Sequence, residues 1–267
     1  MRARLDVEMV RRGLVASRSE AAEMIAAGVV TVAGAMADTP SRLVAKGDPV
    51  NIVGPAPRYV SRGGEKLHHA LAVFNVSTAY RSVLDAGSST GGFTDCVLQH
   101  GARRVAGFDV GKAQMHERLT NDDRVTQHDG VNVRNITSAD VPFSCSLLVA
   151  DVSFISLTKV LPALLAVLCD EDGFDTPEAV VLVKPQFEAG RQEVSKGRGI
   201  ITDPGIWKEA CDAVAECFGT HGYGVCGVVE SPIKGGDGNV EYLMHARLGV
   251  VGQTSHVVTS PTSGDMA

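Results

Sequence analysis

A regular alternation of strand-like apolar runs and helical patterns, which starts at residue 82, restricts the fold of this chain more than any other feature of its sequence. Strands are predicted at 82–85, 104–109, 147–151, 179–184, 224–230 and 240–248, with a further one before Asp129. Helices are predicted between them at 92–100, 157–168 and 206–219. Strands and helices that alternate in this way fold into a doubly wound, mostly parallel sheet. The sequence therefore predicts a Rossmann-like α/β domain.

The first sixty residues have a different pattern. Two short helices are predicted within 5–28, followed by a strand at 29–32, a turn at Ala33-Gly34 and a strand at 49–53. Pro55 and Pro57 interrupt both helix and strand, so a linker is expected after this unit. The predicted organisation is a small α+β domain at 1–54, a linker at 55–61, the α/β domain at 62–249 and a disordered tail at 250–267.

The charge of the chain is distributed unevenly. Its net charge is −6, so the protein as a whole is not a polycation. Residues 1–60 nevertheless hold 8 Lys and Arg against 6 Asp and Glu, whereas the remaining residues are acidic overall. Contacts with phosphate are therefore expected in the N-terminal segment.

The cysteines and the apolar runs indicate the cellular setting. No two of the six cysteines form a Cys-x-x-Cys pair, so no metal site is predicted. The N-terminus lacks the apolar core of a signal peptide, and the longest apolar run, at 160–168, is about half of what a membrane helix needs. We expect a soluble, cytoplasmic protein with no membrane partner.

A glycine-rich turn follows the first strand of the α/β domain. Its sequence from Gly87 to Gly92 is Gly-x-x-x-Gly-Gly, which differs from the Gly-x-Gly-x-x-Gly of dehydrogenases and lacks the lysine of a P-loop. Glycines at this place let the backbone approach a ligand closely. Asp85 ends the first strand, and Asp109 ends the second, where a carboxylate fits the two hydroxyls of an adenosine ribose. NAD would satisfy Asp109 equally well.

Four longer motifs resemble the TlyA family, the hemolysin A-like ribosomal RNA 2′-O-methyltransferases. They are LDAGSSTGGFT at 84–94, ADVSFISL at 150–157, LVKPQFE at 182–188 and GNVEY at 238–242. The resemblance runs from Arg4 to about Leu248. It implies an FtsJ-like, class I methyltransferase domain with a seven-stranded sheet, preceded by an S4-type RNA-binding domain. S-adenosylmethionine is the implied cofactor, and the implied substrate is a cytidine ribose in ribosomal RNA of the large subunit, with the small subunit as a second possible target.

The resemblance and the glycine-rich turn together predict the cofactor site. Asp85 is expected to receive the methionine ammonium, Asp109 the ribose and Asp129 the adenine edge. The predicted cofactor-binding residues are Asp85, Gly87, Ser88, Ser89, Thr90, Gly91, Gly92, Phe93, Asp109, Val110, Asp129 and Asp151.

By motif, the Lys-Asp-Lys-Glu tetrad of the FtsJ-like enzymes falls on Lys66, Asp151, Lys184 and Glu241. A ribose hydroxyl is a weak nucleophile, so it needs a group that orients it and takes its proton. Lys184 closes an apolar strand at the edge where such sheets bind ligands. It acts either as the base or as a donor that steers the hydroxyl, and Asp151 orients it. As a lone residue, Lys66 would be read as a solvated helix residue.

The predicted RNA contacts lie in the N-terminal domain and the linker. They are Arg4, Arg11, Arg12, Arg18 and Arg58. Three other functions stay open at this point: a non-catalytic RNA-binding or ribosome-assembly factor, a membrane-lytic protein as the hemolysin label suggests, and a dehydrogenase. The intact tetrad, the lack of a membrane span and the glycine pattern argue against them in that order.

Overall fold

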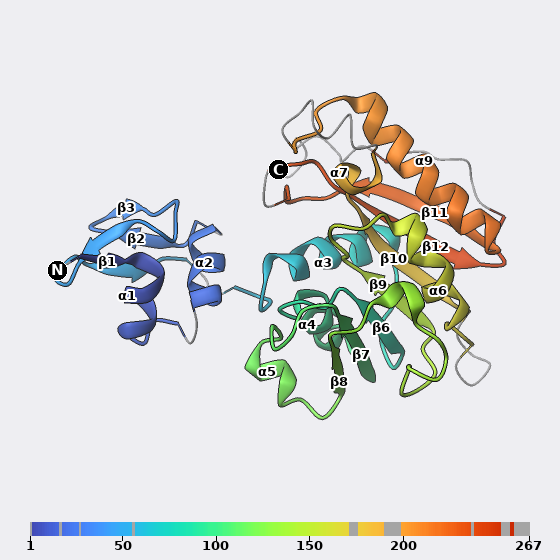
Figure 1. Cartoon of the computed structure of the whole chain (residues 1–267), viewed down its shortest axis with the longest axis horizontal. Helices are drawn as coiled ribbons and strands as arrows, with labels where there is room; N and C mark the ends of the chain where they lie inside the picture. The colour runs from blue at the N-terminus through green and yellow to red at the C-terminus, as the bar shows by residue number, and fades with distance from the viewer. Residues whose placement is uncertain are drawn as a thin grey trace, which may run out of the picture. The chain divides into compact units, whose positions relative to one another are not determined.

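The computed structural model describes residues 2–15, 18–26, 28–54, 57–170, 176–189, 199–235, 238–251 and 257–258. The chain forms two compact units, Met1–Arg62 and Gly63–Ala267 (Figure 1). Most of the predicted tail at 250–267 lies outside the described residues.

The first unit is a small α+β domain. Its helices are α1 (Leu5–Arg11) and α2 (Arg18–Ala26), and its strands are β1 (Arg2–Arg4), β2 (Val30–Val32), β3 (Ala35–Met36), β4 (Leu43–Ala45) and β5 (Val50–Ile52). One sheet has the order β3-β2-β5, and β1 pairs with β4. The predicted turn at Ala33-Gly34 is confirmed, with φ of 52° and 81° as a two-residue hairpin requires. The sequence missed β1, β3 and β4, which are too short to show an alternating pattern.

The second unit is built on a single sheet. Its strands are β6 (Ser82–Ala86), β7 (Arg104–Asp109), β8 (Val125–Asp129), β9 (Leu147–Ala150), β10 (Glu178–Val183), β11 (Tyr223–Glu230), β12 (Tyr242–Leu248) and β13 (Val257–Val258). Their order is β13-β11-β12-β10-β9-β6-β7-β8.

The strand order distinguishes this sheet from that of a dehydrogenase. Counted from β6, the first seven strands lie in the order 3-2-1-4-5-7-6, and β12 runs antiparallel to both of its neighbours, β10 and β11. The dinucleotide-binding sheet has the order 3-2-1-4-5-6 and no inserted strand. The prediction of a mostly parallel, seven-stranded sheet is confirmed. The two-residue β13, parallel to β11, adds an eighth strand that was not predicted.

Helices connect these strands. They are α3 (Arg62–Phe74), α4 (Gly92–Gln99), α5 (Glu117–Thr120), α6 (Leu161–Ala166), α7 (Pro185–Glu188) and α9 (Pro204–Thr220), with 3₁₀ turns η1 (Val133–Asn135) and η2 (Leu157–Lys159). The prediction of one long helix at 157–168 was wrong, because η2 and α6 are separate elements. Pro162 explains the break: its ring clashes with a helical turn before it, so it is tolerated only at the start of a helix.

Both faces of the sheet are buried, as expected for strands between two helical layers. Side chains of one face pack with α6 and α9 in a single core cluster that includes Leu84, Phe108, Leu148, Val181, Leu164 and Phe218. The alternate strand residues, such as Val83, Val149 and Val180, are also fully buried and point to the other face. There Phe74 of α3 stacks with His245 of β12, so helices cover the sheet on both sides.

The core between α9 and the sheet can be tested with Phe218, which is fully buried. We expect Phe218→Ala to lower the free energy of unfolding by about 3–5 kcal/mol, because the lost ring leaves a cavity. Trp207, the single tryptophan, lies on the same helix, so its fluorescence during urea unfolding reports on this unit. Val73→Ala on α3, where the side chain is 44% exposed, is the control and should change stability by less than about 0.5 kcal/mol. Equal effects of the two variants would contradict the packing described.

Candidate active site at the carboxyl edge of the sheet

Four turns meet at one edge of the second unit's sheet. They follow β6, β7, β9 and β10, which are parallel and adjacent, so their carboxyl ends lie together. Open α/β sheets bind their ligands at this edge. The residues that follow each strand are therefore the candidates for the site.

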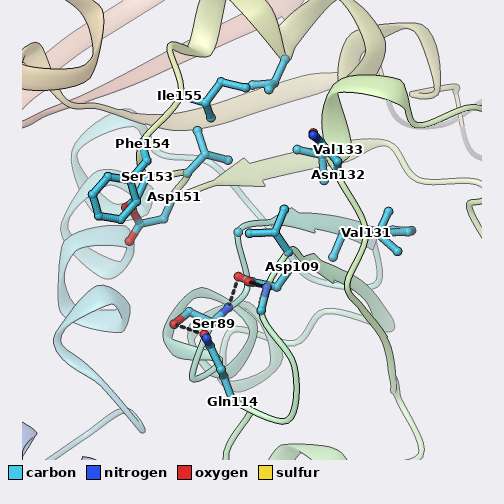
Figure 2. Close-up of a pocket in the computed structure, with 16 residues that line it drawn as sticks. Ser89, Asp109, Gln114, Val131, Asn132, Val133, Asp151, Ser153, Phe154 and Ile155 are labelled. Carbon is cyan, nitrogen blue, oxygen red and sulfur yellow. Dashed lines mark hydrogen bonds between the residues drawn. The ribbon is translucent and has the colours of Figure 1, made fainter.

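A pocket of about 620 Å³ opens among these turns. That volume is within the range of small-molecule sites. Figure 2 shows side chains that converge on it from the ends of β6, β7 and β9 and from the segment after β8. The residues that line it are Gly87, Ser89, Phe108, Asp109, Val110, Gly111, Gln114, Val131, Asn132, Val133, Asp151, Val152, Ser153, Phe154, Ile155 and Val160.

The glycine-rich turn packs directly against the turn after β9. Gly87 has φ of +83°, and a Cβ placed on it would lie 2.5 Å from the carbonyl oxygen of Asp151. Gly91 has φ of +93°, and a Cβ there would lie 2.2 Å from Leu119. Gly87 therefore needs glycine for two reasons, its backbone conformation and its close approach to another backbone segment, whereas at Gly91 the backbone conformation is the main reason, because the nearest atom is a side-chain methyl.

Asp109 is held rigidly at the pocket wall. Its carboxylate accepts hydrogen bonds from the backbone N–H of Ser89 at 2.9 Å and of Gly111 at 2.6 Å. Figure 2 shows these contacts beside the pocket. Each carboxylate oxygen keeps a further lone pair with which to accept a hydrogen bond from a ligand.

The predicted cofactor residues divide into two groups. Those that line the pocket are Gly87, Ser89, Asp109, Val110 and Asp151. Those outside its lining are Asp85, Ser88, Thr90, Gly91, Gly92, Phe93 and Asp129. The lining near Asp129 comes instead from Val131, Asn132 and Val133.

Asp85 is completely buried behind the glycine-rich turn. One of its oxygens accepts a hydrogen bond from the Thr94 hydroxyl at 2.6 Å, and the other has no hydrogen-bond partner among the described residues. Burial, which disfavours the charged form, raises the pKa of Asp85 to about 7, and the charge of Asp151 adds to this effect. A cationic ligand group would compensate the unpaired oxygen.

Lys184 and Asp151 form an ion pair at the ends of β10 and β9. The Lys184 Nζ lies 2.5 Å from Asp151 Oδ1 and donates a hydrogen bond to Ser153 Oγ at 2.8 Å. Lys184 is buried, with 8% of its surface exposed. Two groups from the turn after β9 therefore meet around one ammonium group at the end of β10.

Lys66 and Glu241 form a second buried ion pair. Lys66 Nζ donates to Glu241 Oε2 at 2.5 Å, and both residues are less than 10% exposed. Lys66 is thus not a solvated helix residue. Val183 pairs with Tyr242 on the antiparallel strand β12. Lys184 comes after Val183 and Glu241 comes before Tyr242, so the two residues lie at the same end of two adjacent strands. The structure therefore brings all four tetrad positions to one edge of the sheet.

The residues after Asp151 also line the pocket, and none of them was a predicted site residue. Ser153 contacts Lys184, and Phe154 is 92% exposed with φ of +63°. A bulky residue in this conformation is strained by about 1–3 kcal/mol and needs support from its surroundings. The Phe154 ring contacts that of Phe187, with centroids 5.2 Å apart.

Glu188 supplies the support at the other end of this segment. Its carboxylate accepts hydrogen bonds from the Ser156 hydroxyl at 2.5 Å and from the Leu157 N–H at 2.8 Å. Burial raises the pKa of Glu188. Lys184 and Glu188, four residues apart, thus hold the two ends of 151–157.

Asn239 fixes the segment that leads to Glu241. Its side chain, only 1% exposed, accepts a hydrogen bond from the Ile201 N–H and donates one to the Gly199 carbonyl, both at 2.9 Å. The motif around Glu241 contained this residue, but no local pattern could show that it binds a backbone some 40 residues away.

Four arginines of the first unit share two acidic side chains. Arg4 and Arg18 pair with Asp6, and Arg11 and Arg12 pair with Glu8. Arg12 also donates to the carbonyl groups of 45, 46 and 48, so its guanidinium is used within the fold. These pairs lower the pKa of Asp6 and of Glu8, the latter to about 2. Arg58 lies over the ring of Tyr59 at 5.8 Å.

None of the helices in the described part of the chain combines the length and the apolar character of a membrane span. No group of three or more potential metal ligands was found among the same residues.

Comparison with known proteins identifies the family. The model of the FtsJ-like methyltransferases matches residues 59–248, and that of the S4 domain matches residues 3–50. The chain belongs to the FtsJ-like methyltransferase family. Its FtsJ-like domain contains the whole candidate site, and the S4 domain lies in the first unit.

Two curated relatives of this FtsJ-like methyltransferase match over most of their length. The 16S/23S rRNA (cytidine-2′-O)-methyltransferase TlyA of Mycobacterium tuberculosis is 43% identical over 247 residues, which is 92% of this chain and 90% of the relative. Hemolysin A of Brachyspira hyodysenteriae is 40% identical over 250 residues, 91% of this chain and 98% of the relative. A solved structure from Streptococcus thermophilus, provisionally called a hemolysin, has a TM-score of 0.73 at 40% identity and covers 94% of this chain and 90% of its own.

Gly87 tests the close approach of the two turns. We expect Gly87→Ala to lower the free energy of unfolding by about 3 kcal/mol or more, because the methyl group overlaps the Asp151 carbonyl and forces a backbone shift. The control is Gly249→Ala, which has φ of +74° but no atom within 4 Å of the new Cβ. That change should cost only the conformational term of about 1 kcal/mol. Urea unfolding followed by Trp207 fluorescence measures both, and similar losses would show that the contact at Gly87 is unimportant.

Proposed function

We propose that this protein transfers a methyl group from S-adenosylmethionine to the 2′-hydroxyl of a cytidine in ribosomal RNA. The observation that carries the proposal is the ion pair between the buried Lys184 and the partly exposed Asp151, beside Ser153 on the wall of the pocket. The similarity to a 16S/23S rRNA (cytidine-2′-O)-methyltransferase over nine-tenths of the chain supports the substrate. We place RNA of the large subunit first, with the small subunit as a second target, and the reaction in the cytoplasm.

The pocket residues fit an adenosyl cofactor. Asp109 suits the ribose hydroxyls, and the apolar Val131 and Val133 suit the faces of an adenine ring. The unpaired oxygen of Asp85 suits an ammonium group, which it would reach through a bridging water, since Asp85 does not line the pocket itself. When bound, S-adenosylmethionine supplies a methyl group on a sulfonium, which is a good leaving group. Most of the protein's contribution can therefore be positioning.

Lys184 is the group proposed to hold the target hydroxyl. Asp151 and Ser153 fix its Nζ from two sides, so a third N–H of the ammonium is left to point at a ribose oxygen. As a donor, the Lys184 ammonium would hold the 2′-oxygen in line for attack. As a base, Lys184 would have to be in its neutral amine form, and its Nζ would then take the hydroxyl proton. Lys66 would bind the target ribose or its phosphate at the same edge of the sheet, and Glu241 would complete the hydrogen-bond network around the Lys66 ammonium.

The first unit and the pocket rim are proposed to bind RNA. Asp6 and Glu8 are each shared by two arginines, so each of these two groups keeps one excess positive charge for a phosphate. Arg4, Arg11 and Arg18 are the better candidates there, because Arg12 is used internally. The exposed ring of Phe154 offers a stacking surface for an unstacked base.

Lys184→Ala is the first test. We expect methyl transfer to ribosomal subunits to fall by at least about 100-fold, since the hydroxyl loses the group that orients it. Transfer of labelled methyl from S-adenosylmethionine, followed by mapping of the labelled ribose, measures this. Lys208→Ala is the matched control, because Lys208 forms an exposed ion pair with Asp212 on α9, and it should keep full activity. A wild-type protein that binds the cofactor but labels neither subunit nor free RNA would instead be a non-catalytic RNA-binding factor.

Asp85 predicts a pH dependence of cofactor binding. Its pKa of about 7 in the free protein means that the carboxyl group is mostly protonated at pH 6 and mostly charged at pH 8. Only the charged form attracts the ammonium group, so affinity for S-adenosylmethionine should rise about tenfold over this range. Isothermal titration calorimetry measures the affinity. In Asp85→Asn the affinity should be lower and nearly independent of pH; a wild-type affinity that is flat between pH 6 and pH 8 would refute the role.

A further inference from the structure

The short turn after β7 aims one side chain into the pocket. Gln114 lines the pocket and accepts a hydrogen bond from the Ser89 hydroxyl at 3.2 Å, which Figure 2 shows. The residue before it, Ala113, has φ of +52°, a conformation that costs energy for any residue with a side chain. Something in the fold must therefore hold this turn in place.

Asp129 holds the turn. Its Oδ2 accepts a hydrogen bond from the Ala113 N–H at 2.7 Å, and its Oδ1 accepts one from the Gln127 amide at 3.0 Å. The first of these is the largest cause of a lowered pKa of Asp129, so the carboxylate is charged near neutral pH. Asp129 does not line the pocket, and both of its oxygens point to these protein groups.

The contacts continue to the glycine-rich turn and form a ring. The Ser88 hydroxyl donates to Gln127 Oε1 at 3.1 Å, next to Ser89 in the chain. Gly107 makes room for this contact, because a Cβ there would lie 2.3 Å from Gln127 Oε1. The ring therefore joins the turns after β6 and β7 to the end of β8.

The Gln114 amide and the Asp109 carboxylate converge on one place. Gln114 Nε2 lies 2.3 Å, and Asp109 Oδ1 lies 3.0 Å, from the position that a Cβ on Gly111 would occupy. A carboxylate only accepts hydrogen bonds, whereas an amide nitrogen donates them. A ribose hydroxyl does both, so a donor beside Asp109 completes the set of partners that it needs.

We propose that Gln114 is a second ribose-binding residue of the cofactor site and that the ring through Ser88, Gln127 and Asp129 positions it. This inference rests on the proposed use of S-adenosylmethionine. Gln114 donates to a ribose hydroxyl that itself donates to Asp109. Asp129 acts through Ala113 and is a positioning residue.

Calorimetric binding of S-adenosylhomocysteine, and of its analogues that lack the 2′- or the 3′-hydroxyl, tests the inference. Gln114→Ala should weaken binding of S-adenosylhomocysteine about five- to tenfold, as expected for one lost hydrogen bond. With one of the two deoxy analogues the variant and the wild type should bind equally, because the partner hydroxyl is absent. Gln99→Ala on α4, outside the pocket lining, is the matched control and should bind like the wild type.

The positioning role has its own readout. Asp129→Ala should weaken binding in the same direction, and the double variant with Gln114→Ala should bind no more weakly than Gln114→Ala alone. Urea unfolding followed by Trp207 fluorescence confirms that each variant is folded. Wild-type affinity in Gln114→Ala, or an equal loss with all three ligands, would overturn the ribose contact and leave the proposed function intact. A folded wild-type protein that binds none of the three ligands would overturn both.

Discussion

The pairing of two buried lysines with two carboxylates is the constraint on which the site depends. A lysine taken out of water without a partner costs several kcal/mol, and removal of one member of a buried pair is more damaging than replacement of both. Lys184 and Lys66 are each about 8% exposed and each meet a carboxylate at 2.5 Å. The strand ends must therefore stay in register for either charge to be tolerated. The same ion pairs therefore determine both the geometry of the site and the stability of this edge of the sheet.

The segment from Lys184 to Glu188 contributes both to the geometry of the site and to the stability of the sheet edge. One end of it pairs with Asp151, and the other accepts hydrogen bonds from Ser156 and Leu157. The strained backbone of Phe154 lies between these fixed points. Because each end is held by a charge, the segment can keep an aromatic ring exposed at the pocket rim without collapsing onto it. Rigid elements thus present a residue that by itself would prefer to be buried.

The sequence predicted the larger elements well, because these depend on local patterns. The four tetrad positions came from the family resemblance, and the structure places them at one edge of the sheet. Strands such as 104–109 follow from apolar runs, and Lys184 stands out at the end of one. The break at Pro162 and the short strands β1, β3, β4 and β13 were missed, because short elements have no clear periodicity. Gln114, Glu188 and Asn239 were missed for another reason: their partners lie 25 to 40 residues away, and only the folded chain brings them together. Contacts between residues so far apart in the chain cannot be predicted from the local spacing of residue types.

The direction of β12 has a consequence for how such a site can be assembled. In a wholly parallel sheet, residues that precede a strand lie at the amino edge, far from the ligand. Glu241 precedes its strand, yet it lies beside Lys184, because β12 runs opposite to β10. The reversed strand thus brings residues that precede it to the ligand edge, where its neighbour β10 contributes residues that follow it. A chain rearrangement that made β12 parallel to β10 would conserve every residue of the tetrad and still separate Glu241 from Lys66 by about the length of one strand.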